Sequence, residues 1–240
     1  MADISTYAVI GGGYTGLSIA IDLLDKGHKV LLIEKTSELG GLAKSIQLSN
    51  KKYCEAYYHH FFLDDKYLSK FCYRFLKEKI IYNNTSMSIF YDQKHNSWNG
   101  ILDLLKFSHI NILEKFRFVI STLLLSNNLI NNKNLDSKSL NLGLIELYGK
   151  KAFKSIWGPM IQGKFGEKGN EIPLRWMSGR LQQRLKSRKY GKEKLGYIKG
   201  SLRKLTTAIN VYLSKNRKCS IFKNTEIIDI SYCPRTIKYI

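Results

Sequence analysis

The stretch AVIGGGYTGLSIAIDLLDKGHKVLLIE, residues 8–34, decides which fold the sequence predicts. The apolar run 6–10 ends abruptly at Gly11, as a buried parallel strand does when it enters a tight turn. Residues 15–26 then repeat apolar side chains at the i, i+3, i+4, i+7 spacing of one helix face. Because a second apolar run follows at 29–34, the stretch predicts one β-α-β unit with a right-handed crossover.

Three glycines in the turn after the first strand have the spacing G-x-G-x-x-G. Gly11 allows the tight turn, Gly13 lets the backbone approach a pyrophosphate, and Gly16 allows the helix to pack closely on the strand. The helix N-terminus adds free N–H groups and the positive end of its dipole. The spacing predicts a dinucleotide site, with a purely structural glycine turn as the alternative.

A carboxylate stands at the end of the second strand. Glu34 follows the glycine turn by about 20 residues, the spacing at which an acidic side chain accepts hydrogen bonds from the ribose hydroxyls of an adenosine. Its negative charge would repel a 2′-phosphate, which argues against NADP. We add Tyr14, Thr15 and Lys35, which flank these positions, as candidate cofactor contacts.

The middle of the chain, residues 61–195, changes to helical periodicity with few strand signals. Apolar residues at mixed helical spacing fill 102–125, and the last part of this stretch could lie on a membrane surface or, as is commoner, face the core. Residues 127–139 form a polar connector, whereas 140–161 and 173–185 have helical patterns. This part predicts a mainly helical cap.

The last part of the chain returns to a mixed pattern. Residues 201–213 have the pattern of an amphipathic helix, and three apolar runs then predict strands: CSIFK, EIIDIS and TIKYI. We therefore expect an α/β fold in which a Rossmann-like nucleotide-binding domain is interrupted by the cap. The expected boundaries are 1–60 for the first nucleotide-binding segment, 61–195 for the cap and 196–240 for an incomplete return to the first domain.

Composition indicates a globular chain without a membrane span. The 240 residues are 44% hydrophobic and 12% aromatic, enough to bury a sizeable core. No apolar run reaches the roughly 18 residues of a membrane span, and MADISTY lacks the basic start of a signal peptide, so we expect a soluble, cytoplasmic protein. Of the four widely spaced cysteines only Cys54 has histidines nearby, which predicts reduced thiols and no zinc site.

The formal net charge of +20 favours anionic partners through long-range attraction. Most of the excess is scattered lysine, which is typical of an ordinary solvated surface. The densest basic stretch is RLKSRKYGKEK, residues 184–194, and no nucleic-acid-binding motif surrounds it. We therefore expect no specific nucleic-acid partner, and we leave contact with an anionic membrane surface open.

A further pair of glycines distinguishes FAD from NAD. Gly40 and Gly41 in ELGGLAKS follow Glu34 at a spacing that resembles the flavin amine oxidase superfamily. That group includes protoporphyrinogen oxidases, phytoene desaturase-like enzymes and, more distantly, UDP-galactopyranose mutases. The resemblance implies FAD as the cofactor, with the double glycine close to its flavin end. Leu42 stands where many members have a contacting arginine, and Lys44 is the candidate substitute.

Further segments resemble the same superfamily. EAYYHHFFLDD, residues 55–65, is similar to a segment beside the flavin, which implies that His59 or His60 contacts flavin or substrate. A structural histidine is the equal alternative. NTEIIDI is similar to a strand whose backbone contacts adenine, which implies that contact at Ile227. SIWGPMIQGKFGE, residues 155–167, resembles part of the substrate domain, where we expect its aromatic residues to pack rather than react.

The resemblance implies an FAD-dependent oxidoreductase in which flavin accepts a hydride from a C–H bond of a bulky small-molecule substrate. Two alternatives remain open, a flavoprotein like the UDP-galactopyranose mutases and a non-catalytic remnant that binds a nucleotide. Members of the superfamily continue well beyond this length, so we expect a truncated or split chain that lacks part of the flavin pocket. Its catalytic residues are therefore not assigned, and its exposed apolar surface would seek a complementing polypeptide.

Overall fold

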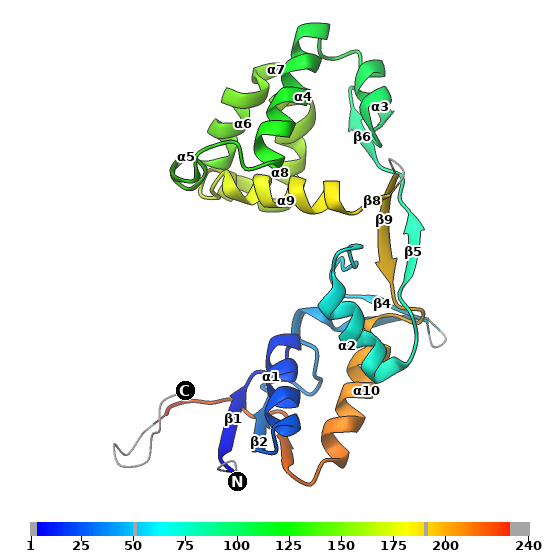
Figure 1. The fold of residues 1–240 in the computed structure, drawn as a ribbon, viewed down its shortest axis with the longest axis vertical. Helices are drawn as coiled ribbons and strands as arrows, with labels where there is room; N and C mark the ends of the chain where they lie inside the picture. Colours follow the sequence, from blue (N-terminus) through cyan, green and yellow to red (C-terminus); the bar gives the residue numbers. More distant parts are fainter. Residues whose placement is uncertain (1–3, 50–51, 190–191, 231–240) are drawn as a thin grey trace. The chain divides into compact units, whose positions relative to one another are not determined.

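The computed structural model describes residues 4–49, 52–189 and 192–230. The chain forms two compact units, which can be followed along the colour bar of Figure 1. Unit 1 consists of Met1–His60, Lys66–Ile81 and Tyr197–Ile240, and unit 2 consists of Phe61–Asp65 and Tyr82–Gly196. Each unit has buried apolar residues of its own.

A three-stranded parallel sheet in the order β1-β2-β10 organises unit 1. Its strands are β1 (Thr6–Ile10), β2 (Lys29–Ile33) and β10 (Cys219–Phe222). Helix α1 (Tyr14–Asp25) connects the first two strands, and the residues that it buries are Leu17, Ala20, Ile21 and Leu24. The β-α-β unit predicted from residues 8–34 is therefore confirmed, and with it the α/β fold.

Two more helices and a hairpin complete unit 1. They are α2 (Lys66–Leu76), α10 (Leu202–Lys215) and the antiparallel strands β3 (Ser45–Ser49) and β4 (Lys52–Glu55). The sequence placed α2 in the cap, but Arg74 forms a bidentate ion pair with Asp25 of α1 at 2.6 and 2.7 Å. The Phe75 ring also packs edge-on against Tyr212 of α10. These contacts explain why Lys66–Ile81 belongs to unit 1.

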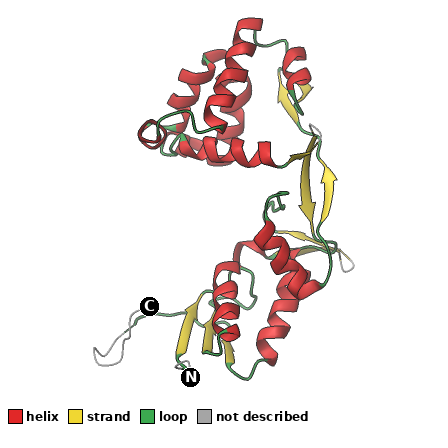
Figure 2. Ribbon diagram, in the orientation of Figure 1, coloured by secondary structure: helices red, strands yellow, loops and turns green. Residues whose placement is uncertain are grey.

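Helices dominate unit 2, as the red ribbons of Figure 2 show. The longer ones are α4 (Ile112–Ser126), α6 (Leu140–Tyr148), α8 (Gly158–Phe165) and α9 (Arg175–Lys186). The shorter ones are α3 (Ile101–Lys106), α5 (Asn132–Ser137), α7 (Lys150–Ala152), a π-helical turn at Phe153–Trp157 and a 3-10 turn at Gly166–Asn170. In their core Phe118 stacks on Trp157 with a centroid distance of 5.5 Å, and Tyr148 meets both rings edge-on.

Two kinds of element in this part of the chain were not expected from the sequence. Short strands lie here: β5 (Ile81–Asn84), β6 (Ser88–Tyr91), β7 (Lys94–Ser97), β8 (Arg188–Lys189) and β9 (Lys192–Tyr197). Most are too short and too polar to show the apolar alternation that signals a strand. Helix α5 lies within the expected connector 127–139, because the Asn131 side chain caps it and Leu135 is buried.

The end of the described chain differs from the prediction. Strand β10 confirms the strand expected at CSIFK, but residues 226–230 form no strand. Asn224 has φ +52°, and its N–H donates to Thr36 O at 3.2 Å, so the chain leaves the strand direction and lies against the loop that follows β2. The strand expected at TIKYI, together with Cys233, lies outside the described residues.

Among the described residues, no helix is both long enough and apolar enough to cross a bilayer. In the same part of the chain no group of three metal-ligating side chains comes together. Cys54, Cys72 and Cys219 are free thiols, and burial raises the pKa of the Cys72 thiol to about 11, so it stays protonated at neutral pH.

Candidate functional site

The glycine turn after β1 has the tight geometry that its spacing predicts. Gly11 has φ +98°, in the region that favours glycine, and its N–H donates to Ile33 O of β2 at 2.8 Å. A Cβ on Gly16 would lie 2.0 Å from Gly11 O, so no side chain fits between α1 and the turn. These two glycines let the chain pass directly from β1 into the helix.

The N-terminus of α1 is open toward the turn. Gly13 is its N-cap, no side chain caps the helix, and the first turn contains no acid. Leu17 N–H donates to Gly13 O at 2.9 Å, which leaves the N–H groups of Tyr14, Thr15 and Gly16 without a helical acceptor. Free donors at the positive end of a helix dipole are suited to binding phosphate groups.

The Glu34 carboxylate lies buried behind the turn, with 9% of its surface exposed. Its Oε2 accepts from Gly12 N–H at 2.6 Å, and its Oε1 accepts from the N–H and the hydroxyl of Thr36, each at 2.8 Å. Burial works to raise the pKa of Glu34, but these hydrogen bonds together outweigh it and hold the pKa below its usual value. The carboxylate is therefore an anion at neutral pH. Three hydrogen bonds occupy three of its roughly four acceptor positions, which leaves one position free.

Gly12 is a site residue that the G-x-G-x-x-G spacing does not single out. A Cβ there would lie 2.5 Å from Leu39 Cδ2 and 3.0 Å from Glu34 Oε2, and Gly12 O accepts from Gly40 N–H at 2.8 Å. Gly12 thus joins the first glycine cluster to Glu34 and to the double glycine. Its signal in the sequence is the unbroken GGG at 11–13, whereas Thr36 has no comparable signal.

The double glycine lies directly against the turn. Gly40 forms an isolated parallel bridge with Gly13, and a Cβ on Gly41 would lie 3.0 Å from Gly13 Cα. Both residues have positive φ, +118° for Gly40 and +55° for Gly41. The structure therefore brings the separated glycine clusters together at the carboxyl ends of β1 and β2.

Other sequence-predicted contacts lie around this centre. Tyr14 OH is 3.0 Å from Thr206 Oγ1 of α10, and burial raises the pKa of Tyr14 to about 12, so this side chain connects two helices rather than facing the turn. Thr15 is exposed on the first turn of α1. Leu42, at the expected arginine position, is 71% exposed.

The segment after β10 returns to the end of β2. Thr225 N–H donates to Glu34 O at 3.0 Å, and Lys35 Nζ pairs with Glu226 Oε1 at 2.6 Å. These contacts hold the neighbouring Ile227 beside the strand end that carries Glu34, although Ile227 is not part of a strand. Its side chain is 36% exposed and therefore accessible to a ligand.

His59 and His60 follow β4, and each contacts a tyrosine two residues before it. His59 Nδ1 lies 2.7 Å from Tyr57 O, and the His60 ring centroid lies 4.8 Å from that of Tyr58. Both histidines are half-buried. A contact of either one with flavin or substrate stays a prediction from the resemblance.

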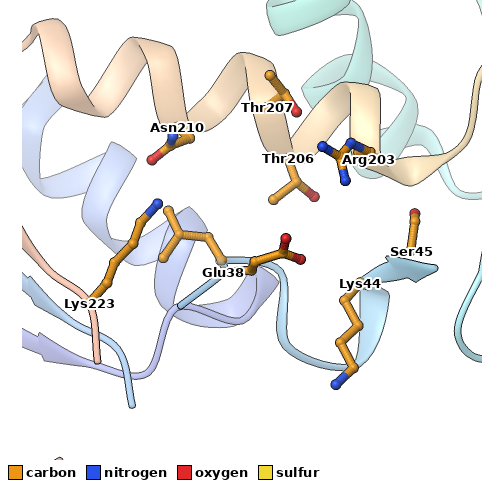
Figure 3. Close-up of a pocket in the computed structure, with 9 residues that line it drawn as sticks. Glu38, Lys44, Ser45, Arg203, Thr206, Thr207, Asn210 and Lys223 are labelled. Carbon is orange, nitrogen blue, oxygen red and sulfur yellow. The ribbon is translucent and has the colours of Figure 1, made fainter. Parts of the chain in front are cut away.

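Unit 1 contains a polar pocket of about 150 Å³. Figure 3 draws the side chains that line it. The loop after β2, the start of β3, one face of α10 and the residue after β10 supply its lining: Glu38, Leu39, Lys44, Ser45, Arg203, Thr206, Thr207, Asn210 and Lys223. Side-chain atoms of Thr206 would lie 3.4 Å from a Cβ on Gly40. In Figure 3 Lys44 points away from the other labelled side chains, so its ammonium group is not directed into the pocket.

Comparison with known proteins gives a partial sequence match and a fuller structural one. Residues 9–75 match the family model described as an NAD(P)-binding Rossmann-like domain, and no curated protein matches the chain.

A protein from Exiguobacterium sp. 255-15 named as a candidate protoporphyrinogen oxidase is 15% identical, with a TM-score of 0.61 over 98% of this chain and 55% of that chain. A reduced UDP-galactopyranose mutase is 15% identical, with a TM-score of 0.64 over 93% and 48%. A putrescine oxidase bound to putrescine is 16% identical, with a TM-score of 0.66 over 92% and 50%.

These likenesses confirm the fold that the sequence predicted. The chain has a Rossmann-like domain, and its fold is similar to the folds of these three structures. At identities of 15% and 16% the solved structures concern the fold alone. The chain spans about half the length of each of these three structures.

Proposed function

We propose that unit 1 binds FAD and that the chain acts as part of an FAD-dependent oxidoreductase. The observation that carries this proposal is the contact of Gly13 with both Gly40 and Gly41. It brings a second pair of residues without side chains onto the open N-terminus of α1. The resemblance to flavin amine oxidases assigns that pair to the flavin end of FAD. This assignment requires the pair to lie beside the glycine turn, which would hold the pyrophosphate.

The residues of the site fit the cofactor. The free N–H groups of residues 14–16 would hold the pyrophosphate. The remaining acceptor position of Glu34 would take one ribose hydroxyl, and its charge would exclude a 2′-phosphate. A Cβ on Gly13 would meet no protein atom closer than 4.0 Å, so the space in front of it is open to a ligand. Ile227 would lie against the adenine.

When bound, FAD supplies a hydride acceptor, and the protein supplies binding and orientation. We propose a C–H bond of a small organic molecule as the hydride donor, in line with the oxidases that share this fold. A sugar-nucleotide mutase reaction is the second candidate, because a UDP-galactopyranose mutase shares the fold with a TM-score of 0.64. The chain's location in the cytoplasm and its need for a complementing polypeptide remain parts of the proposal.

Titration of the 240-residue chain with FAD tests the cofactor. FAD should bind at least about tenfold more tightly than NAD⁺ or NADP⁺. Gly13→Val should weaken FAD binding by about tenfold or more without unfolding the chain, because the new side chain fills ligand space rather than protein space. Gly163→Val is the matched control, since a Cβ at Gly163 in α8 meets nothing within 4 Å. Equal affinity for FAD and NAD⁺, or unchanged affinity in Gly13→Val, would contradict the proposal.

Anaerobic assays of the FAD-loaded chain separate the reactions. Bleaching of the flavin by an amine or a porphyrinogen supports the oxidoreductase. Isomerisation of UDP-galactopyranose without net flavin reduction supports the mutase instead. Bound FAD with neither outcome identifies the chain by itself as a nucleotide-binding module, which leaves turnover to the proposed complementing polypeptide.

A further inference from the structure

Helix α4 in unit 2 presents an uncovered apolar face. Five large apolar side chains lie on it, and each is at least half exposed: Ile112 56%, Leu113 75%, Phe116 63%, Ile120 57% and Leu123 50%. At 100° per residue these positions fall within a sector of about 100° around the helix. We call these five residues the α4 face. It contains no polar atom in any side chain.

The core of unit 2 does not use this face. Phe118, Ser121 and Leu125 lie on the opposite side of α4 and are buried. The start of the helix is held by a capping box, in which Asn111 and Glu114 each bond the other's backbone N–H. The sequence left open whether this stretch faces a core or a membrane, and the structure shows a helix with both a buried and an exposed apolar side.

Cations border the α4 face on both sides. Lys115 and Arg117 fall about 90–110° to either side of its centre on the helical wheel. Lys115 Nζ donates to Leu105 O of α3 at 2.6 Å, and Arg117 Nε donates to Leu147 O at 2.8 Å. Neither bond is to a carboxylate, so both positive charges stay uncompensated by these contacts.

Helix α3 repeats the pattern on a smaller scale. Its exposed side consists of Ile101, Leu102 and Leu105, exposed by 59%, 68% and 51%, with Lys106 at the edge. Asp103, the acid of this helix, accepts from Asn99 N–H at 2.7 Å and from the Ser97 hydroxyl at 2.8 Å. Two consecutive helices thus combine an exposed apolar side with flanking cations.

We propose that the α4 face lies on the surface of an anionic lipid bilayer, with the helix axis in the membrane plane. Apolar side chains with flanking lysine and arginine are typical of helices that bury one side in the headgroup region. The formal net charge of +20 complements anionic lipid. A protein partner is the less fitting occupant, because its contact surfaces favour Tyr, Trp and Arg anchors with hydrogen bonds. The α4 face has four aliphatic side chains and one phenylalanine, and it offers no hydrogen-bonding group.

Sedimentation with vesicles tests this proposal on the whole 240-residue chain. Vesicles of phosphatidylserine and phosphatidylcholine should bind the protein at least about tenfold more tightly than phosphatidylcholine alone, with affinity falling as salt rises. The double variant Phe116→Glu with Ile120→Glu should lose about tenfold or more of this affinity. Both positions are exposed, so its melting temperature should match the wild type. Leu142→Glu is the matched control, an apolar position of α6 that is 62% exposed and lies outside the α4 face.

Three results with vesicles would overturn the proposal. They are wild-type binding no tighter to anionic than to neutral vesicles, undiminished binding by the double variant, and a loss of equal size in Leu142→Glu. Sedimentation equilibrium without lipid tests whether a second copy of the chain covers the α4 face instead. A wild-type dimer that the double variant converts to a monomer would assign the face to a second copy of the chain. Because no flavin is involved, these results are independent of the FAD titration.

Discussion

The glycine turn of unit 1 and the aromatic core of unit 2 are built in opposite ways. The turn depends on side chains that are missing, since a Cβ at Gly12 or Gly16 would overlap its neighbours at 2.5 and 2.0 Å. The core depends on large rings that fill space, with Phe118 stacked on Trp157 at 5.5 Å. The difference shows that the glycine turn is sensitive to added atoms and the aromatic core to removed ones.

The largest expected effect is that of Gly16→Ala. Its Cβ would meet the backbone oxygen of Gly11, which cannot move without breaking the turn, so we expect a loss of at least about 5 kcal/mol in the free energy of unfolding. Gly179→Ala in α9 is the matched control, because its Cβ meets nothing within 4 Å and alanine favours a helix by about 1 kcal/mol. Urea unfolding measures both. Similar stabilities for the two variants would contradict the close packing of α1 on the turn.

Trp157→Ala should be the next most damaging change. Removing a buried indole leaves a cavity and should cost about 3–5 kcal/mol of unfolding free energy. Trp157→Phe keeps a ring and removes an indole N–H that has no hydrogen-bond partner in the described structure, so it should cost about 1–2 kcal/mol. FAD affinity measured at a temperature where the chain is folded should not change in either variant. A selective loss of FAD binding would give Trp157 a role beyond packing.

Glu34→Gln tests the buried carboxylate of the glycine turn through the pH dependence of stability. The folded pKa of Glu34 is lowered, so its ionised form stabilises the fold above the unfolded pKa of about 4.3, and this contribution is lost as pH falls through the folded pKa. Unfolding free energies between pH 3 and 7 should therefore depend less on pH in Glu34→Gln. Near neutral pH the variant should be less stable and bind FAD more weakly, by about 1.5–3 kcal/mol each.

Glu226→Gln is the control for this experiment. The carboxylate of Glu226 pairs with Lys35 at the surface, with 60% of its side chain exposed, so its loss should cost less than about 1 kcal/mol. If the pH dependence of the two variants were the same, the buried position of Glu34 would have no special influence on stability.

Tyr14→Phe should have the smallest effect of the four. It removes the hydroxyl that bonds Thr206 across α1 and α10, which should cost about 0.5–1.5 kcal/mol in thermal unfolding. Tyr67→Phe serves as the control because Tyr67 is 91% exposed. A tenfold loss of FAD affinity in Tyr14→Phe would instead place this hydroxyl at the cofactor.

Local sequence patterns predicted the elements whose formation depends mainly on neighbouring residues. The β-α-β unit at residues 8–34 needs only apolar periodicity and glycine punctuation, and both are readable in the sequence. The strands β6 and β7 were missed because each has only four residues, and so short a strand depends on pairing with its partner rather than on a pattern of its own. The prediction of a strand at residues 226–230 was wrong, because backbone hydrogen bonds of Asn224 and Thr225 draw the chain toward the loop after β2.

The residues of the glycine turn could be predicted from the sequence alone, because its glycines and the carboxylate at the end of the second strand have a recognisable spacing. The hydrogen bonds that Gly12 and Thr36 donate to the Glu34 carboxylate could be seen only in the folded chain. The tertiary structure also decided that Gly40 lies on Gly13 and that one side of α4 is uncovered. The physical reason is that hydrogen-bond partners and burial depend on residues distant in sequence, whereas turn and helix preferences depend on neighbours.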